Sequence, residues 1–223
     1  MKKSKILLSA GLLLIAAALA LAIYNIYDAN RASASVSKAA HKLEEMITPI
    51  VKEEDAPILP PKDNVSENPE AVPEEPEIGK NLPLYVSHPD MEMPVAEIDG
   101  TGYIGLLEIP ACELKLPVIS SWSYPNLKLG PCRYSGSAYK GDFVIAAHNY
   151  SSHFGRLDWL QPGDLVRFTD VDGNVFVYTV ELTETLTPHE TEAMTDSGWE
   201  LSLFTCTLDG SNRSTVRCRL AEK

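Results

Sequence analysis

The stretch LSLFTCT at residues 201–207 is followed by the loop LDGSN and then by RSTVRCRL at residues 213–220. Two β-like segments joined by a short loop rich in turn-forming residues predict an antiparallel hairpin. If the loop closes between Thr207 and Asn212, Cys206 lies opposite Arg213. The two-residue period of a strand then puts both side chains on the same face of the hairpin.

The same register assigns the rest of the second segment to faces. Val216 and Cys218 point to the opposite face, whose apolar members mark it as the core side, so Cys218 is not expected to bond with Cys206. Arg217 shares the face of Arg213. A longer loop would bring Arg217 into the place of Arg213, although Arg217 would then oppose the middle of the partner strand.

A second apolar segment, FVIAA at residues 143–147, predicts a strand that is covered on both faces, and it leads directly into His148. If this strand lies parallel and adjacent to the one that ends in Cys206, the thiol and the imidazole meet at one rim. His153 follows five residues later, near the start of a predicted helical turn. We interpret it as a rim or capping residue with a small prospect of contacting a ligand.

The remaining pattern from residue 100 onward consists of short β-like segments separated by turn signals, which is typical of a barrel or sandwich. Strands are expected near residues 103–109, 113–119, 143–148, 164–170, 175–182, 200–206 and 213–220. Helical turns are expected near residues 124–129 and 154–160, and a hairpin at Asp172-Gly173.

The chain begins with lysines and then runs without charge from Ile6 to Ile23, nearly enough to span about 30 Å of hydrocarbon. We expect residues 1–5 to form a cytoplasmic tail, residues 6–24 a single-pass membrane anchor, and the rest of the chain to lie outside. A cleavable signal peptide is the alternative, since Ala20-Leu21-Ala22 is a small-x-small site.

Residues 25–98 are expected to form an acidic, Pro-rich stalk that precedes a catalytic domain at residues 99–223, because prolines and repelling carboxylates oppose compaction. Within the stalk, residues 34–50 could form a short helix with apolar side chains on one side; the rest should be extended. These side chains are those of Val36, Ala39, Ala40, Leu43, Ile47 and Ile50.

The charge and the cysteines exclude several classes of protein. The chain has 31 acidic and 19 basic residues, and a formal net charge of −12 argues against a nucleic-acid surface. Its four cysteines are too few and too irregularly spaced for a disulfide-framework miniprotein or a zinc ribbon. A bridge between Cys112 and Cys132 stays open at this stage.

Cys206, His148 and Arg213 are the residue types that cysteine acyl-transfer chemistry needs. A neighbouring cation favours the thiolate, and a guanidinium suits a substrate carbonyl or a developing oxyanion. Each residue alone also has a structural interpretation: a buried cysteine, a structural histidine, or an arginine paired with a surface carboxylate.

These motifs together resemble the sortase family. LFTCT at residues 203–207 resembles the strand that ends in Thr-Cys, and VIAAHN at residues 144–149 is similar to the strand that ends in Gly-His-Asn, with Ala147 in place of the commoner glycine. Arg213 is similar to the family's arginine. Further agreement covers YIGLLEIP at 103–110, LPV at 116–118, SGS at 135–137 and LQPGD at 160–164, so the match spans residues 100–223.

The resemblance implies a closed eight-stranded β-barrel with catalytic Cys206, His148 and Arg213. Cys206 would attack a carbonyl within a C-terminal sorting motif of a secreted protein, commonly of the Leu-Pro-x-Thr-Gly type, and form an acyl-thioester. His148 would protonate the departing amine and Arg213 would hold the oxyanion. A cell-wall or pilin amine would then accept the acyl group, and the chemistry would require no metal or organic cofactor.

Three alternatives stay open. A cysteine peptidase would use the same residues with water as the acceptor, and a non-catalytic surface-binding module would not use the thiol. Within the family, the lack of an obvious lid segment and of a hydrophobic segment after Lys223 favours a B- or D-like member over a pilus-type C member.

Overall fold

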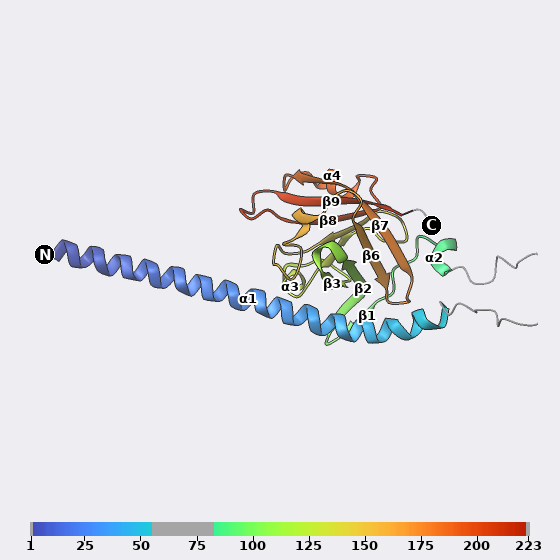
Figure 1. Cartoon of the computed structure of the whole chain (residues 1–223), viewed down its shortest axis with the longest axis horizontal. Helices are drawn as coiled ribbons and strands as arrows, with labels where there is room; N and C mark the ends of the chain where they lie inside the picture. The colour runs from blue at the N-terminus through green and yellow to red at the C-terminus, as the bar shows by residue number, and fades with distance from the viewer. Residues whose placement is uncertain (1, 55–82, 222–223) are drawn as a thin grey trace, which may run out of the picture.

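The computed structural model describes residues 2–54 and 83–221 and shows a β-barrel with a long helix lying along one side (Figure 1). Nine strands form one sheet in the order β1-β2-β3-β4-β5-β8-β9-β7-β6, and a further pairing of β2 with β6 closes it. The closed ring therefore contains eight strands, with β1 added outside the ring on β2. This confirms the expected eight-stranded barrel.

The elements are few and short apart from the first helix. The strands are β1 (Ala96–Ile98), β2 (Thr101–Ile109), β3 (Leu114–Ile119), β4 (Cys132–Ser135), β5 (Phe143–Ala146), β6 (Leu165–Asp170), β7 (Val175–Leu186), β8 (Leu201–Cys206) and β9 (Arg213–Leu220). The helices are α1 (Lys2–Glu54), α2 (Leu84–Ser87), α3 (Tyr124–Leu127) and α4 (Thr191–Thr195), with 3-10 turns η1 (Pro110–Cys112) and η2 (Leu157–Trp159).

Closure of the barrel depends on a close approach of two strands at a glycine. Gly105 on β2 pairs with Asp170 on β6. A Cβ atom at residue 105 would lie 2.2 Å from the backbone oxygen of Thr169, so only glycine lets the two strands meet there. The side chains that point inward form one buried cluster that includes Leu107, Ile145 and Val216.

All seven strands that the sequence predicts are present, whereas β1 and β4 were not predicted. β4 has only four residues, and its pairing with β5 shifts register between Arg133 and Ser135, so it shows no clear alternation. β1 has three residues and lies inside the range that composition assigned to the stalk.

Helix α1 differs most from expectation. It continues without a break through Glu54, so the helix predicted over residues 34–50 is confirmed, whereas the prediction of extended chain on either side of it is wrong for residues 29–33 and 51–54. A helix is costly to nucleate but cheap to extend, and the apolar first half supplies the nucleus. The part of α1 from Ala10 to Ile47 contains a window long and apolar enough to cross a membrane.

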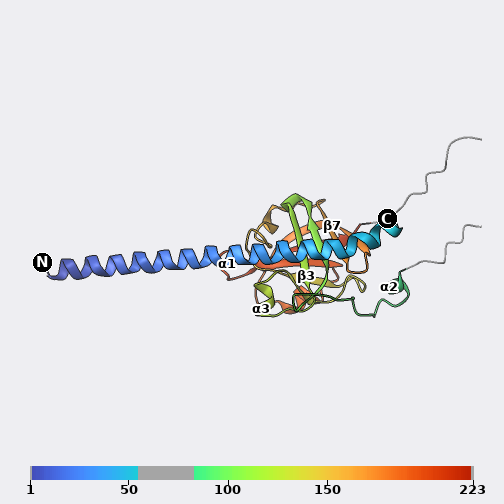
Figure 2. The same cartoon turned by 90° about the horizontal axis from the view of Figure 1, so that it is seen from below.

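The second half of α1 packs on the outside of the barrel. The side chains predicted to share one side are buried there against β1, β2 and β3, among them Leu43, which is fully buried, and Ile47. Ion pairs flank this contact. Lys42 Nζ lies 2.9 Å from Asp99 Oδ1, and Lys115 Nζ lies 2.6 Å from Glu44 Oε1. In Figure 2, which shows the molecule from below, α1 lies across the surface of the barrel.

The end of the predicted stalk also belongs to the folded body. Met93 is buried in the barrel cluster, Tyr85 stacks on Tyr139 with ring centroids 4.6 Å apart, and β1 pairs with β2. Residues 55–82, which contain most of the prolines and nearly half of the carboxylates of the predicted stalk, lie outside the described residues, as does the side chain of Ile50.

We expect Leu43→Ala to lower the free energy of unfolding by about 2–4 kcal/mol, because it leaves a cavity between α1 and the barrel. Met46→Ala, on the exposed side of the same helix, should change it by less than about 0.5 kcal/mol. Denaturant unfolding of the full chain in detergent measures both. Equal effects of the two substitutions would contradict the packing of α1 on the barrel.

Candidate active site

The predicted hairpin forms with the predicted register. β8 and β9 are antiparallel, with Cys206 opposite Arg213 and Phe204 opposite Thr215. Val216 and Cys218 lie in the barrel core, which confirms the assignment of faces. The reactive side chains of β8 and β9 therefore lie on the outer face of the barrel wall, and the apolar ones on the inner face.

β5 lies parallel to β8, so both strands end at the same rim. Ala146 pairs with Phe204, and the amide of Ala147 donates to the carbonyl oxygen of Phe204 at 3.1 Å. His148 follows Ala146 by two residues, and Cys206 follows Phe204 by two. The structure thus brings His148 and Cys206 to matching positions at the ends of two neighbouring strands.

Cys206 is the one cysteine of the four that is partly exposed; all four are free, so Cys112 and Cys132 are not bridged. Burial raises the pKa of Cys132 and of Cys218 to about 12 and also raises that of Cys112, which keeps these thiols protonated and inert. Among the four cysteines, Cys206 alone is accessible to solvent and also lies beside a strand, β5, that leads into a histidine, His148.

His148 is half-buried, and this burial lowers the pKa of its imidazole. Asp28 on α1 opposes the shift, and Lys128 adds to it. The imidazole is therefore mostly neutral near pH 7, in the form that can accept a proton from a thiol.

The two arginines of β9 differ in what surrounds them. Arg217 is buried, and its donors are used: it donates to Glu184 at 2.6 Å and to Ser202 at 2.7 Å. Its other partners are the hydroxyl of Ser197 and two backbone carbonyls of α4. Arg213 donates to the carbonyl oxygens of Asn212 at 3.0 Å and Gly210 at 3.5 Å, and among the described residues it meets no carboxylate. Arg213 therefore keeps charge available for a ligand.

His153 does not lie at the rim, so that interpretation is wrong. The side chain is fully buried, and neither ring nitrogen has a hydrogen-bond partner within the described part of the chain. Burial lowers its pKa to about 4. The reason is that the loop after β5 folds back on itself, with the amide of Phe154 donating to the carbonyl oxygen of His148 at 3.0 Å.

Tyr150 is a site residue that sequence reasoning missed. Its ring stacks on His148 with centroids 4.9 Å apart and contacts His153 at 5.4 Å. Its hydroxyl donates to Asp28 Oδ2 at 2.6 Å. An aromatic residue two positions after His148 was the available signal, but its partner lies 122 residues earlier in the chain.

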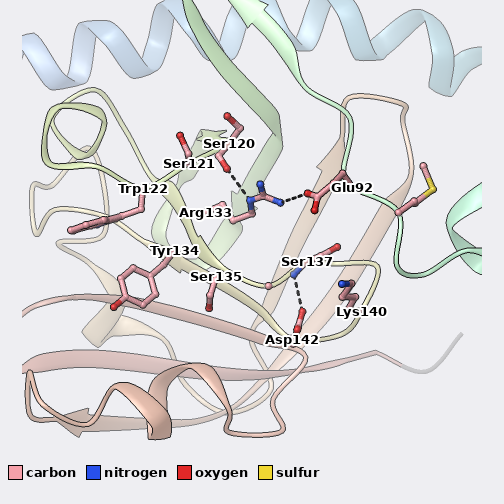
Figure 3. A pocket seen from close by; sticks show the side chains of 12 residues that line it. Glu92, Ser120, Ser121, Trp122, Arg133, Tyr134, Ser135, Ser137, Lys140 and Asp142 are labelled. Atoms are coloured by element: carbon pink, nitrogen blue, oxygen red, sulfur yellow. Dashed lines mark hydrogen bonds and ion pairs between the residues drawn. The ribbon is translucent and has the colours of Figure 1, made fainter.

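A pocket of about 550 Å³ lies on the outer face of the barrel beside β4 (Figure 3). Tyr134 on its wall meets Trp122 at 5.8 Å and Phe204 at 5.1 Å, both between ring centroids. Phe204 precedes Cys206 by two residues, so both side chains lie on the same face of β8. The contacts of Trp122, Tyr134 and Phe204 therefore run from the pocket to the face of β8 that carries the thiol. The lining also includes charged side chains of both signs, those of Glu92, Arg133, Lys140 and Asp142.

The described residues contain no group of three or more His, Cys, Asp or Glu side chains that could hold a metal ion. Cys206, His148 and Arg213 supply a thiol, an imidazole and a guanidinium to the site. A closed barrel with one accessible cysteine at a strand end, beside a strand that leads into histidine, is the arrangement of a cysteine enzyme.

A family model for the Sortase domain matches residues 107–221, which is more than half of the chain. Sortase A of Bacillus anthracis is 31% identical over 140 residues, covering 59% of this chain and 66% of the length of that protein. The chain belongs to the sortase family, whose members are cysteine transpeptidases.

Solved structures of similar proteins include sortase C1 from Streptococcus agalactiae, with 26% identity, a TM-score of 0.49, and coverage of 57% of this chain and 72% of that one. A Clostridium perfringens sortase D5 transpeptidase has 22% identity, a TM-score of 0.47, and coverage of 54% and 79%.

Arg217→Ala should lower the free energy of unfolding by about 3 kcal/mol, because it leaves Ser202 and the carbonyls near α4 without their donor. Arg213→Ala removes hydrogen bonds to exposed loop carbonyls only and should cost less than about 1 kcal/mol. Thermal or denaturant unfolding of the two variants compares them directly. The reverse order would contradict the structural assignment of Arg217.

Stability should fall as the pH drops from about 6.5 towards about 4, partly through His153. In this window the unfolded histidine binds a proton while the buried one does not, so protons favour unfolding. His153→Leu should flatten this part of the profile. Unfolding at a series of pH values tests this; an unchanged slope in His153→Leu would refute it.

Proposed function

We propose that this protein is a membrane-anchored sortase that cleaves a C-terminal sorting motif of secreted proteins and joins the new carboxyl end to an amine. The observation that carries the proposal is the pairing of β8 with both β9 and β5, since it sets Cys206 opposite Arg213 and level with His148. The partly exposed thiol of Cys206 supports it, as does the guanidinium of Arg213, which pairs with no carboxylate among the described residues.

The proposed reaction has two transfers. The neutral imidazole of His148 takes the proton of the Cys206 thiol as sulfur attacks the motif carbonyl, and the guanidinium of Arg213 stabilises the oxyanion. The C–N bond breaks, the departing amine takes the proton from His148, and an acyl-thioester remains on Cys206. An incoming amine then attacks the thioester, loses a proton to His148, and releases the sulfur.

The substrate is proposed to be a secreted protein with a motif of the Leu-Pro-x-Thr-Gly type, and the acceptor a cell-wall or pilin amine. The basic start of the chain before the apolar run supports an N-terminus in the cytoplasm and a barrel on the outer side. α1 is compatible with such a single-pass anchor.

Cys206→Ala and His148→Ala should abolish turnover of a sorting peptide by the full chain in detergent. Arg213→Ala should lower kcat by at least about 100-fold, because it removes a donor to the oxyanion, and Arg213→Lys should recover only part of the loss. The matched control is Arg167→Ala, an exposed arginine on β6, which should stay within about twofold.

Intact-mass spectrometry with a panel of sorting peptides provides the direct test. The parent protein should gain the mass of the acyl fragment, the adduct should map to Cys206, and Cys206→Ala should gain nothing. A turnover product without any adduct on Cys206 would overturn the nucleophile assignment. If no peptide reacts and Cys206→Ala binds sorting peptides as the parent does, a non-catalytic surface-binding module is the better account.

Transfer and hydrolysis are separated by adding an amine. A transpeptidase yields a new amide in proportion to added amine, whereas a peptidase yields only the free carboxylate at an unchanged rate. A cell-wall peptide amine and a pilin lysine peptide serve as two arms, and the one that gives amide product identifies the acceptor class.

A further inference from the structure

The starting observation is the change in surroundings along α1. Side chains from Leu12 to Tyr27 are exposed, and burial on the barrel side begins at Asp28 and reaches the core contact by Ala32. Figures 1 and 2 both show the first half of the helix projecting straight from one end of the barrel and the second half lying along it. No loop or bend separates the two halves.

The level at which α1 would leave a bilayer follows from helix geometry. About 20 residues cross the roughly 30 Å of hydrocarbon, so a span that begins at Ile6 ends near residue 25. Tyr24 and Tyr27 are exposed at this level, where aromatic residues commonly mark the membrane–water interface. Asp28 then lies about 5 Å beyond the hydrocarbon, which is within the headgroup layer.

Asp28 also contacts the site. It accepts the hydrogen bond of the Tyr150 hydroxyl at 2.6 Å, and the ring of Tyr150 stacks on His148. The proposed catalytic histidine is therefore one side chain away from the point where the helix emerges from the span.

The direction of the strands places the thiol at the same end. β9 runs from Arg213 to Leu220, and in Figure 1 it finishes at the end of the barrel away from the projecting half of α1. The loop between β8 and β9, next to Cys206, is thus at the end that faces the span.

The surface at this end has the chemistry of an interfacial contact. Leu208, in the loop after Cys206, is 96% exposed, and Tyr124 on α3 is 73% exposed. Lys128, which follows α3, is close enough to Asp28 and His148 to affect their titration, and Arg31 pairs with Asp28 while remaining half exposed. Exposed apolar and aromatic tips with nearby cations suit a layer of phospholipid headgroups.

We propose that the rim carrying Cys206, His148 and Arg213 faces a phospholipid headgroup surface and is held against it by the docked half of α1. The proposal rests on the proposed anchoring by α1 but not on the proposed transpeptidation. Its consequence is that a polypeptide reaches Cys206 from the layer next to the headgroups.

The test uses the full chain in phosphatidylcholine–phosphatidylglycerol vesicles, with Trp122, Trp159 and Trp199 replaced by phenylalanine. A single tryptophan is introduced at the rim (Leu208→Trp) or at the far end of β9 (Leu220→Trp). A lipid with a nitroxide on its headgroup should quench the rim reporter at least about threefold more than the far one. Equal quenching, or stronger quenching of Leu220→Trp, overturns the proposal.

Undocking of α1 should remove the difference between the two reporters. Leu43→Glu puts a charge into the buried contact and should undock α1. The double substitution Lys38→Glu and Lys42→Glu removes the exposed pairs with Asp99 without touching the core, and it should leave most of the difference in place. Far-ultraviolet circular dichroism reports whether each variant is folded. Undocked variants that keep the full quenching difference would show that α1 does not hold the rim.

Two controls separate this inference from the function. Cys206→Ala should show the same quenching difference as the parent, so loss of activity does not affect the readout. Flotation of the vesicles reports anchoring: a chain that does not float refutes both the anchor and the orientation, whereas one that floats with equal quenching refutes the orientation alone.

Discussion

The parallel pairing of β5 with β8 is the interaction on which the site depends. Parallel neighbours need a long crossover, and here the chain between them builds β6, β7 and α4. Because parallel strands finish at the same edge, the ladder from Phe143 to Ala146 delivers the following histidine beside the cysteine that ends β8. Because the barrel closes through Gly105, β5 and β8 have a paired strand on each side. A shift of either strand by one residue would turn its core-facing side chains outward.

The faces of the hairpin show how one strand serves both core and chemistry. On β9, Val216 and Cys218 fill the barrel while Arg213 and Arg217 point outward. The two arginines differ in their hydrogen-bond partners, and therefore in what they can do. Arg217 is enclosed by α4 and β7 with its donors used, and so holds the wall beside the site. Arg213 lies at the end of the strand next to the loop, and its partners among the described residues are loop carbonyls.

Sequence reasoning succeeded where local periodicity decides the structure. Closure of the loop between Thr207 and Asn212 predicted Cys206 opposite Arg213, and alternation in residues 213–220 predicted the faces of the strand. The apolar run before His148 indicated a covered strand. It failed where distant contacts decide. A spacing of five residues cannot show that the loop buries His153, and nothing near Tyr150 indicates Asp28 as its partner. Composition assigned residues 29–54 to a stalk. The apolar side of residues 34–50 predicted a helix there, but periodicity does not show that this side packs on β1 to β3.

The strength of that packing determines how firmly α1 orients the barrel. The pairs of Lys38 and Lys42 with Asp99 are largely exposed, and such pairs contribute little and weaken with salt. The apolar contact buries several side chains, with Leu43 and Ile47 the largest, and each contributes on the order of 1–2 kcal/mol. Their sum exceeds the energy of the ion pairs several-fold. The orientation of the rim is therefore set mainly by apolar burial, and it should persist at ionic strengths that abolish the surface pairs.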